Sequence, residues 1–294
     1  MEPPTDRNSL RGLLSAEPGS FPEAPCALTD LSDCCRGNGY LFRPVGAFTK
    51  AELCPCVLKC RRCFGTAQQT SKGVARSCRT PSPRKVVSLF NNAAIPSRYA
   101  DAHLGVFENM SGNCLKVVHD VRQWQRHFLS SPKRKGLIIS GTVGVGKTYL
   151  ITALARAVAE KGVSVRFVDF FQLLSQIRAC YSENKSDHTI LRPLYKADVL
   201  FVDELGKGRN TEFEAVVLDQ LIMNRYNENK ILVASTNLYL GKKRAKAADK
   251  EDQPAFNQIG SLEERVGERV FSRLKETTEF LEIQGKDFRQ LDKL

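Results

Sequence analysis

The 294-residue sequence contains no apolar run that approaches the ~20 residues needed for a membrane-spanning helix. Its first 25 residues contain acidic residues and prolines, where a secretory signal would need a basic start and an apolar middle. Hydrophobic residues make up 42% of the chain and charged residues 26%. These features predict a soluble cytoplasmic protein with no membrane partner.

Acidic residues are also scarce, with 32 Asp and Glu against 44 Lys and Arg, which gives a formal net charge of +12. Such an excess favours a polyanionic partner, because basic side chains that neutralise phosphates release counterions. It also occurs in basic chains that are merely soluble, so charge alone does not decide between the two. The histidines are scattered and none has the spacing of a metal ligand: His103, His119, His127 and His188.

Cysteine is concentrated at one end of the chain, since eight of the ten lie between Cys26 and Cys78. In a reducing cytoplasm such a cluster indicates metal ligation before disulfides. Residues 31–80 are basic and poor in aliphatic side chains, so a metal would have to stabilise them. We expect a small zinc-binding module there, preceded by a flexible tail at residues 1–30, which are rich in Pro, Ser and Glu.

Beyond the cysteines, "RTPSPRK" (79–85) is typical of a linker, and we assign 81–135 to a linker and the N-terminal part of the next domain. Short apolar runs then alternate with helical patterns at 147–162 and 211–229. The runs predict strands at 136–140, 163–169, 199–205, 231–237 and 278–284. Residues 136–294 should therefore form an α/β core whose parallel sheet is flanked by helices. Residues 241–260 interrupt the alternation and are expected to be a charged, mobile loop.

"GTVGVGKT" fits the pattern G-x-x-x-x-G-K-[ST] between a predicted strand and a predicted helix. In this context the Lys147 ammonium can reach the β- and γ-phosphates, and the Thr148 hydroxyl can ligate Mg²⁺. The backbone of the whole stretch is expected to bind the phosphates: Gly141, Thr142, Val143, Gly144, Val145, Gly146, Lys147 and Thr148.

"VLFVDELGKG" (199–208) ends an apolar strand in Asp203 and Glu204. Asp203 is placed to hold Mg²⁺ beside Thr148, and Glu204 to orient and deprotonate an attacking water. The stretch also fits the Asp-x-x-Gly motif of GTPases, and "NKSD" (184–187) fits their guanine motif. GTPases have the guanine motif after the Asp-x-x-Gly strand, whereas here it comes before, so the order favours adenine.

Two later features extend this ATPase interpretation. "ILVASTN" places Asn237 at the end of a strand, where its amide could hold the water or could simply terminate the strand. Residues 261–276 predict an amphipathic helix that presents Arg265, Arg269 and Arg273. Such arginines usually form a solvated face, but an ATPase active between subunits needs an arginine from its neighbour.

Together these motifs resemble the AAA+ ATPases of the bacterial replicative helicase loader family (DnaC and DnaI type) and the related IstB transposition helper ATPases. The resemblance runs from about Cys35 to Gly285. It is carried by "AAIPSRYADAHLGVF" (93–107), "GTVGVGKTYLITALA", "ADVLFVDELG", "LIMNRYNENK" with Arg225-Tyr226, "ASTNL" and "LEERVGERVFSRLKE", in this order.

The resemblance implies roles for these residues. Lys147 and Thr148 match the Walker A motif, Asp203 and Glu204 the Walker B motif, and Asn237 the sensor 1 position. Arg273 matches the arginine finger, with Arg269 as the less favoured alternative. The family often has Asp-Asp where this chain has Asp203-Glu204. The 241–260 insertion is longer than is usual in the family and has no assigned role.

The resemblance further implies an ATP- and Mg²⁺-dependent protein that self-associates into a ring or spiral and loads a DnaB-type replicative helicase onto single-stranded DNA. Two alternatives remain open: an IstB-like helper of a transposase, and a non-catalytic adaptor that binds ATP.

Loaders of the DnaI type also carry an N-terminal zinc domain, which would be the helicase-binding surface. "CRGNGY", which starts at Cys35, and "CPC" match two of its parts, but a preceding C-x-x-C is replaced by adjacent cysteines, which leaves the fourth ligand open. A C-x-x-C further along could grip a second Zn²⁺. The candidate zinc ligands are Cys35, Cys54, Cys56, Cys60, Cys63 and Cys78.

Overall fold

The computed structural model describes residues 35, 38–55, 57, 68–71, 74–77, 82–110, 115–130, 134–240, 260–285 and 287–288. Its centre is a five-stranded parallel sheet with the order β6-β7-β8-β5-β9. The strands are β5 (Gly136–Gly141), β6 (Val165–Asp169), β7 (Val199–Asp203), β8 (Ile231–Thr236) and β9 (Thr278–Ile283). All five predicted strands and the parallel sheet are confirmed. β5 and β7 are buried along their whole length, as expected where helices cover both faces.

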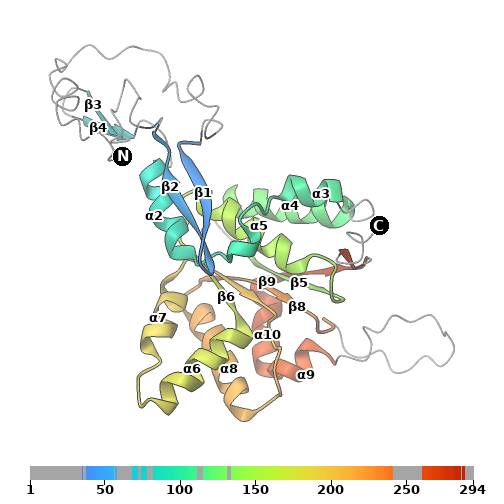
Figure 1. The fold of residues 1–294 in the computed structure, drawn as a ribbon. Coiled ribbons are helices and arrows are strands. Elements are labelled where there is room, and N and C mark those ends of the chain that lie inside the picture. The colour runs from blue at the N-terminus through green and yellow to red at the C-terminus, as the bar shows by residue number, and fades with distance from the viewer. Residues whose placement is uncertain are drawn as a thin grey trace.

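Helices lie on both faces of the sheet (Figure 1). One layer contains α2 (Pro83–Ala93), α3 (Leu104–Met110), α4 (Leu115–Ser130) and α5 (Lys147–Glu160), with a short 3₁₀ turn, η3 (Ser97–Tyr99). The other contains α6 (Phe170–Ser182), α7 (His188–Lys196), α8 (Glu212–Asn227), α9 (Leu262–Val266) and α10 (Glu268–Thr277). Each layer packs its apolar side chains against one sheet face, which gives two core clusters. The helices predicted at 147–162 and 211–229 are confirmed as α5 and α8.

Two antiparallel hairpins precede the core: β1 (Tyr40–Val45) with β2 (Phe48–Leu53), and β3 (Gln68–Ser71) with β4 (Val74–Ser77). The first hairpin packs on α2, where the Asn91 amide bonds both backbone groups of Ala51, at 2.7 and 3.0 Å. The Phe42 and Phe90 rings are 4.3 Å apart. Residues 40–53 thus share a core with α2, and the domain division near residue 80 stays a prediction.

One local prediction was wrong, and a second was wrong in the described part of its range. The stretch 261–276 is two helices rather than one, because Gly267 between them has φ 81° and breaks the helical path. Within the predicted 79–85 linker, Pro83 and Lys85 already belong to α2, whose N-cap Ser82 accepts a hydrogen bond from the Lys85 N–H. Proline at a first helical position favours a helix start rather than a linker.

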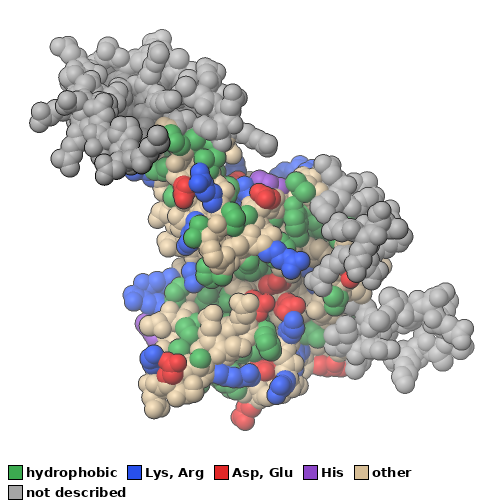
Figure 2. Space-filling view, in the orientation of Figure 1, with side chains coloured by type: hydrophobic (Ala, Val, Ile, Leu, Met, Phe, Trp, Pro, Cys, Tyr) green, Lys and Arg blue, Asp and Glu red, His purple; other side chains and the backbone are tan. Residues whose placement is uncertain are grey.

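Other predictions lie outside the described residues, namely the tail at 1–30 and positions 241–259 of the expected loop. None of the helices in the described ranges combines the length and apolarity needed to cross a bilayer. On the face drawn in Figure 2, Lys and Arg side chains are interspersed with acidic ones. The net positive charge therefore does not form one continuous patch on that face.

A buried arginine stabilises the amino-terminal edge of the sheet. Arg225, at the end of α8, is only 2% exposed. Its guanidinium donates to the carbonyls of Leu194, Ala197, Asp198 and Ile231 at 2.6 to 3.0 Å. Burial lowers the pKa of Arg225 to about 10, so it stays charged at neutral pH. These bonds join the loop before β7 to the start of β8. They also satisfy carbonyl groups that would each cost about 1–3 kcal/mol if they were buried without a partner.

Candidate functional site

The phosphate loop connects the buried strand β5 to the N-terminus of α5. Gly144 and Gly146 have φ values of 86° and 87°, which only glycine adopts without strain. A Cβ atom on Gly146 would lie 2.5 Å from the Phe107 ring, so packing also excludes a side chain there. The loop therefore presents backbone N–H groups at the positive end of the α5 dipole, an arrangement that favours anions.

Lys147, the first residue of α5, lies against this loop and is only 8% exposed. Its ammonium donates to the carbonyls of Gly141 (2.9 Å) and Thr142 (2.6 Å). These bonds compensate a cation that would otherwise be costly to bury. The positive charge is thereby held beside the loop N–H groups, where an anionic ligand would meet both.

Asp203, at the end of β7, contacts both the start of α5, which follows the phosphate loop, and the neighbouring strand β8. The Thr148 hydroxyl donates to Asp203 Oδ1 at 3.0 Å, and the Ser235 hydroxyl donates to the same oxygen. The three residues follow or end β5, β7 and β8, and the carboxyl ends of parallel strands share one edge of a sheet. The structure therefore brings together the two residues that the sequence predicted for Mg²⁺, with a hydroxyl and a carboxylate as oxygen donors.

The environment of Asp203 opposes its charge. Burial raises the pKa of the Asp203 carboxyl, and the Glu204 and Asp169 carboxylates raise it further, while the hydrogen bonds from Ser235 and Thr148 act in the opposite direction without cancelling the rise. A nearby cation would stabilise the ionised form of this carboxyl group, which burial disfavours.

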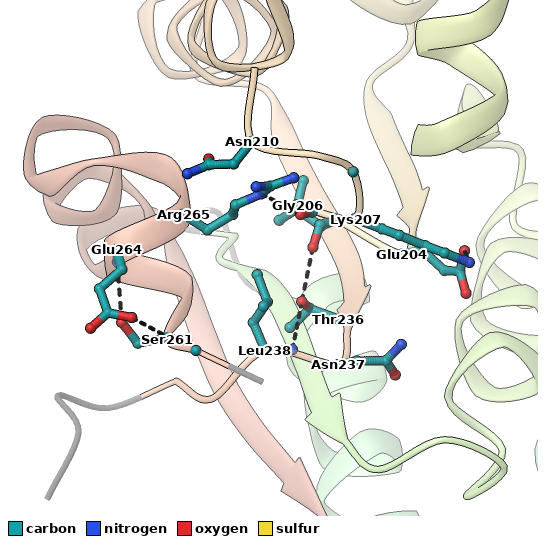
Figure 3. Close-up of a pocket in the computed structure, with 13 residues that line it drawn as sticks. Glu204, Gly206, Lys207, Asn210, Thr236, Asn237, Leu238, Ser261, Glu264 and Arg265 are labelled. Carbon is teal, nitrogen blue, oxygen red and sulfur yellow. Dashed lines mark hydrogen bonds and ion pairs between the residues drawn. The ribbon is translucent and has the colours of Figure 1, made fainter. Parts of the chain in front are cut away.

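Glu204 directly follows Asp203 and has φ 55°, an uncommon conformation for a residue with a side chain. Its N–H donates to the Ser235 hydroxyl at 3.1 Å, which holds this backbone turn. The Glu204 carboxylate pairs with the Lys207 ammonium, and Figure 3 shows the two side chains ending together. The Glu204 carboxylate thus directly follows Asp203 in the chain but is paired with a lysine of its own loop.

Glu204 and Asn237 line one pocket of about 380 Å³, between the loop after β7, the end of β8 and the start of α9 (Figure 3). Arg265 lines it too, and donates to the Gly206 carbonyl (2.6 Å) and to Glu214 (3.2 Å). Sequence reasoning placed Arg265 on a helix face and did not predict this contact with the loop after Asp203.

The other two arginines of that stretch lie elsewhere. Arg269 donates to both carboxylate oxygens of Asp219 at 2.7 Å. The Arg273 guanidinium lies over the Tyr226 ring, 5.3 Å from its centroid. Tyr226 is near the end of α8, which leads to the amino end of β8, so Arg273 lies towards the edge of the sheet opposite the phosphate loop. A single chain therefore does not bring Arg273 to Asp203.

Sequence reasoning missed two further residues. Ser235 lies within both "ILVASTN" and "ASTNL" but received no predicted role, although a hydroxyl inside a buried apolar strand is a recognisable signal. Glu214 is a buried acid that accepts hydrogen bonds from Arg178, Arg265 and the Asn210 N–H. Burial raises the pKa of Glu214, but the bonds from backbone N–H groups and from Arg178 outweigh it and leave the pKa below its ordinary value. No local pattern identifies its two arginine partners.

A family model described as IstB-like ATP binding protein matches residues 79–255. The chain is 33% identical to the uncharacterized protein YdaV of Escherichia coli K12 over 99 residues, which cover 34% of this chain and 40% of YdaV. It is 26% identical to the replicative helicase loader DnaC of Buchnera aphidicola from Acyrthosiphon pisum over 144 residues, covering 45% and 57% of the two chains. It therefore spans about half the length of these two relatives.

The match to the replicative helicase loader DnaC of Escherichia coli K12 is longer, with 24% identity over 216 residues that cover 71% of this chain and 78% of DnaC. Among solved structures, a crystal structure of the DnaC helicase loader is 26% identical, with a TM-score of 0.48, and covers 64% of this chain and 99% of that one.

The raised pKa of Asp203 predicts the effect of an Asp203→Asn substitution on stability. A carboxyl whose pKa is higher in the folded chain destabilises it above that pKa, and the cost disappears as the pH falls through it. Without Mg²⁺ at mildly alkaline pH, the variant should unfold at a higher urea concentration than the wild type, and the difference should narrow as the pH falls. Asp219→Asn, at a partly buried acid paired with Arg269, is the control and should show no such gain. A variant less stable than the wild type at alkaline pH would contradict this account.

Proposed function

The chain belongs to the family of IstB-like ATP-binding proteins, and we propose that it is an AAA+ ATPase that loads a DnaB-type replicative helicase onto single-stranded DNA in the cytoplasm. The named DnaC relatives support the helicase, since the match to the Escherichia coli loader covers 71% of this chain. The basic net charge supports a nucleic-acid partner.

The observation that carries the ATPase proposal is the hydrogen bond of 3.0 Å between Thr148 and Asp203. It places a hydroxyl and a carboxylate together beside the phosphate loop, and these are the oxygen donors that Mg²⁺ takes in such sites. Burial disfavours the Asp203 charge, which a divalent cation would compensate. When bound, Mg²⁺ supplies Lewis-acid stabilisation of the charge on the transferring phosphoryl group.

The remaining steps use the side chains of the chain itself. The loop N–H groups and Lys147 bind the phosphates of ATP. Glu204 exchanges its contact with Lys207 for the attacking water and accepts its proton. Asn237, at the end of β8, holds that water on the same side of the pocket.

Arg273 acts on a neighbouring copy of the chain. Because it lies towards the opposite edge of its own sheet, it reaches a phosphate site only if a second subunit presents it there. Self-association into a ring or spiral would provide that arrangement, with each Arg273 stabilising the charge of its neighbour's phosphoryl group.

Two other functions fit the same fold. The match to an IstB-like family model over residues 79–255 favours a helper of a transposase. The pairing of Glu204 with Lys207 favours a non-catalytic adaptor, since the carboxylate that would activate water is engaged. ATP turnover distinguishes the adaptor from the loader, and the identity of the protein partner distinguishes the helper.

Zinc in the cysteine-rich module is part of the proposal. Cys35 and Cys54 lie in one small buried cluster with Val57, and the Gly39 N–H donates to Cys35 Sγ at 3.3 Å. Two thiols cannot complete a tetrahedral site, and within the described ranges no group of three or more His, Cys, Asp or Glu could hold a metal. The other ligands would come from cysteines outside the described residues: Cys56, Cys60, Cys63 and Cys78. Docking of the helicase is assigned to this module.

Metal analysis of the purified full chain tests the zinc site. We expect at least one Zn²⁺ per chain, and its loss in Cys54→Ser, because a structural site needs all its ligands. Cys180→Ser, on α6, is the matched control and should retain the metal. A wild-type chain that contains no zinc after purification under reducing conditions would refute the site.

ATP hydrolysis by the full chain, with and without single-stranded DNA, tests the enzyme. Glu204→Gln should lower turnover by at least about 100-fold while ATP binding persists, because general-base catalysis is lost and the phosphate site is not. Arg273→Ala should lower turnover at least as much. Glu279→Gln, an exposed acid on β9, is the control for a lost charge. A wild-type rate no higher than that of Glu204→Gln would favour the adaptor instead.

Affinity capture with the full chain from a lysate of its source, followed by mass spectrometry, tests the partner. The replicative helicase should be recovered, and a second capture with that purified helicase should show direct binding. Recovery of a transposase without the helicase would replace the loader by the transposition helper.

A further inference from the structure

The adjacent residues Arg225 and Tyr226, at the end of α8, face different environments. The Arg225 guanidinium is enclosed by four backbone carbonyls, and a stabilising role is sufficient to account for this residue. Tyr226 is only partly buried, and its ring lies under the guanidinium of Arg273 on α10. An aromatic face at this distance attracts a cation and limits its movement.

The Tyr226 hydroxyl has a second contact on the same helix. It donates to the Glu276 carboxylate at 3.1 Å, and this bond together with the Glu276 charge raises the pKa of the Tyr226 phenol. Glu276 is three residues after Arg273 on α10, a spacing at which opposite charges on a helix can pair. In the described part of the chain, however, Glu276 forms no ion pair with Arg273 and is bonded to Tyr226 instead.

The hydrogen-bonding capacity of Arg273 is incompletely used. Its Nη1 donates to the Arg269 carbonyl at 3.1 Å, and its Nε is buried without a hydrogen-bond partner within the described residues. A guanidinium is always charged and has five N–H donors. Arg273 is thus fixed in place by an aromatic ring and a helix carbonyl, while its charge remains available to an anion from outside the chain.

We propose that Tyr226 is a positioning residue for Arg273: its ring supports the guanidinium, and its hydroxyl holds Glu276 away from that cation. The ligand of Arg273 is then the transferring phosphoryl group of ATP bound by a neighbouring copy of the chain. A carboxylate paired with Arg273 would occupy the position of that anion and repel it. This inference rests on the proposed ATPase function. It gives a role to Tyr226, whereas Arg225 has a stabilising one.

Steady-state ATP turnover and ATP binding by full-length variants test the inference. Tyr226→Ala removes the ring and should lower kcat about threefold to fivefold. Tyr226→Phe keeps the ring but releases Glu276, and should lower kcat about twofold to fivefold. The double variant Tyr226→Phe with Glu276→Gln should recover the wild-type rate, whereas adding Glu276→Gln to Tyr226→Ala should not. The dissociation constant for ATP should stay unchanged in all of them.

Mixed assemblies distinguish positioning from a general loss of structure. Tyr226→Ala subunits keep an intact phosphate site, and Glu204→Gln subunits keep an intact Arg273 and Tyr226. Mixing them should raise turnover above the sum of the separate rates, because intact arginines then face intact phosphate sites. The control, Tyr226→Ala mixed with Arg273→Ala, should show no gain.

The outcomes separate the inference from the function on which it depends. An active wild type whose rate equals that of Tyr226→Ala, or a Tyr226→Phe defect that persists with Glu276→Gln, overturns the role of Tyr226 and leaves the ATPase intact. A wild type without turnover, or an Arg273→Ala variant as active as the wild type, overturns the proposed function and with it this inference.

Discussion

The site depends on the contacts made by the Asp203 carboxylate at the end of β7. This carboxylate accepts hydrogen bonds from Thr148, at the start of the helix after β5, and from Ser235 in β8. Three strands are thereby joined at one edge by a buried negative charge that its surroundings disfavour. Glu204, which follows Asp203 and lines the neighbouring pocket, is held by the same Ser235 through its backbone N–H.

The two edges of the sheet have different roles. The carboxyl edge carries Asp203, whose charge burial disfavours, and Glu204, whose backbone has a left-handed conformation. The amino edge is stabilised by Arg225, whose guanidinium binds four carbonyls and leaves little freedom there. The proposed ATPase function uses both edges, since Asp203 lies at the carboxyl edge and Arg273 lies towards the amino edge.

Arg265 and Arg273 lie on opposite sides of a break between two helices, and this break separates their contacts. The sequence predicts one continuous helix, in which residues eight apart would point about 80° apart, towards the same side of the helix. The break at Gly267 separates them, so that Arg265 contacts the loop after β7 while Arg273 contacts Tyr226. Arg265 therefore contacts a loop of its own chain, whereas the role proposed for Arg273 needs a neighbouring copy.

The sequence by itself determined the five strands, the two long core helices and the order of motifs at the phosphate loop. These features follow from the spacing of apolar side chains and from local glycine and hydroxyl positions, which are encoded within a few residues. Only the tertiary structure decided that Arg265 meets Gly206 and Glu214, that Ser235 bonds Asp203, and that residues 40–53 pack on α2. Each of these contacts joins residues about 30 or more positions apart. Their partners are chosen by how the layers pack on the sheet, and no local pattern records that choice.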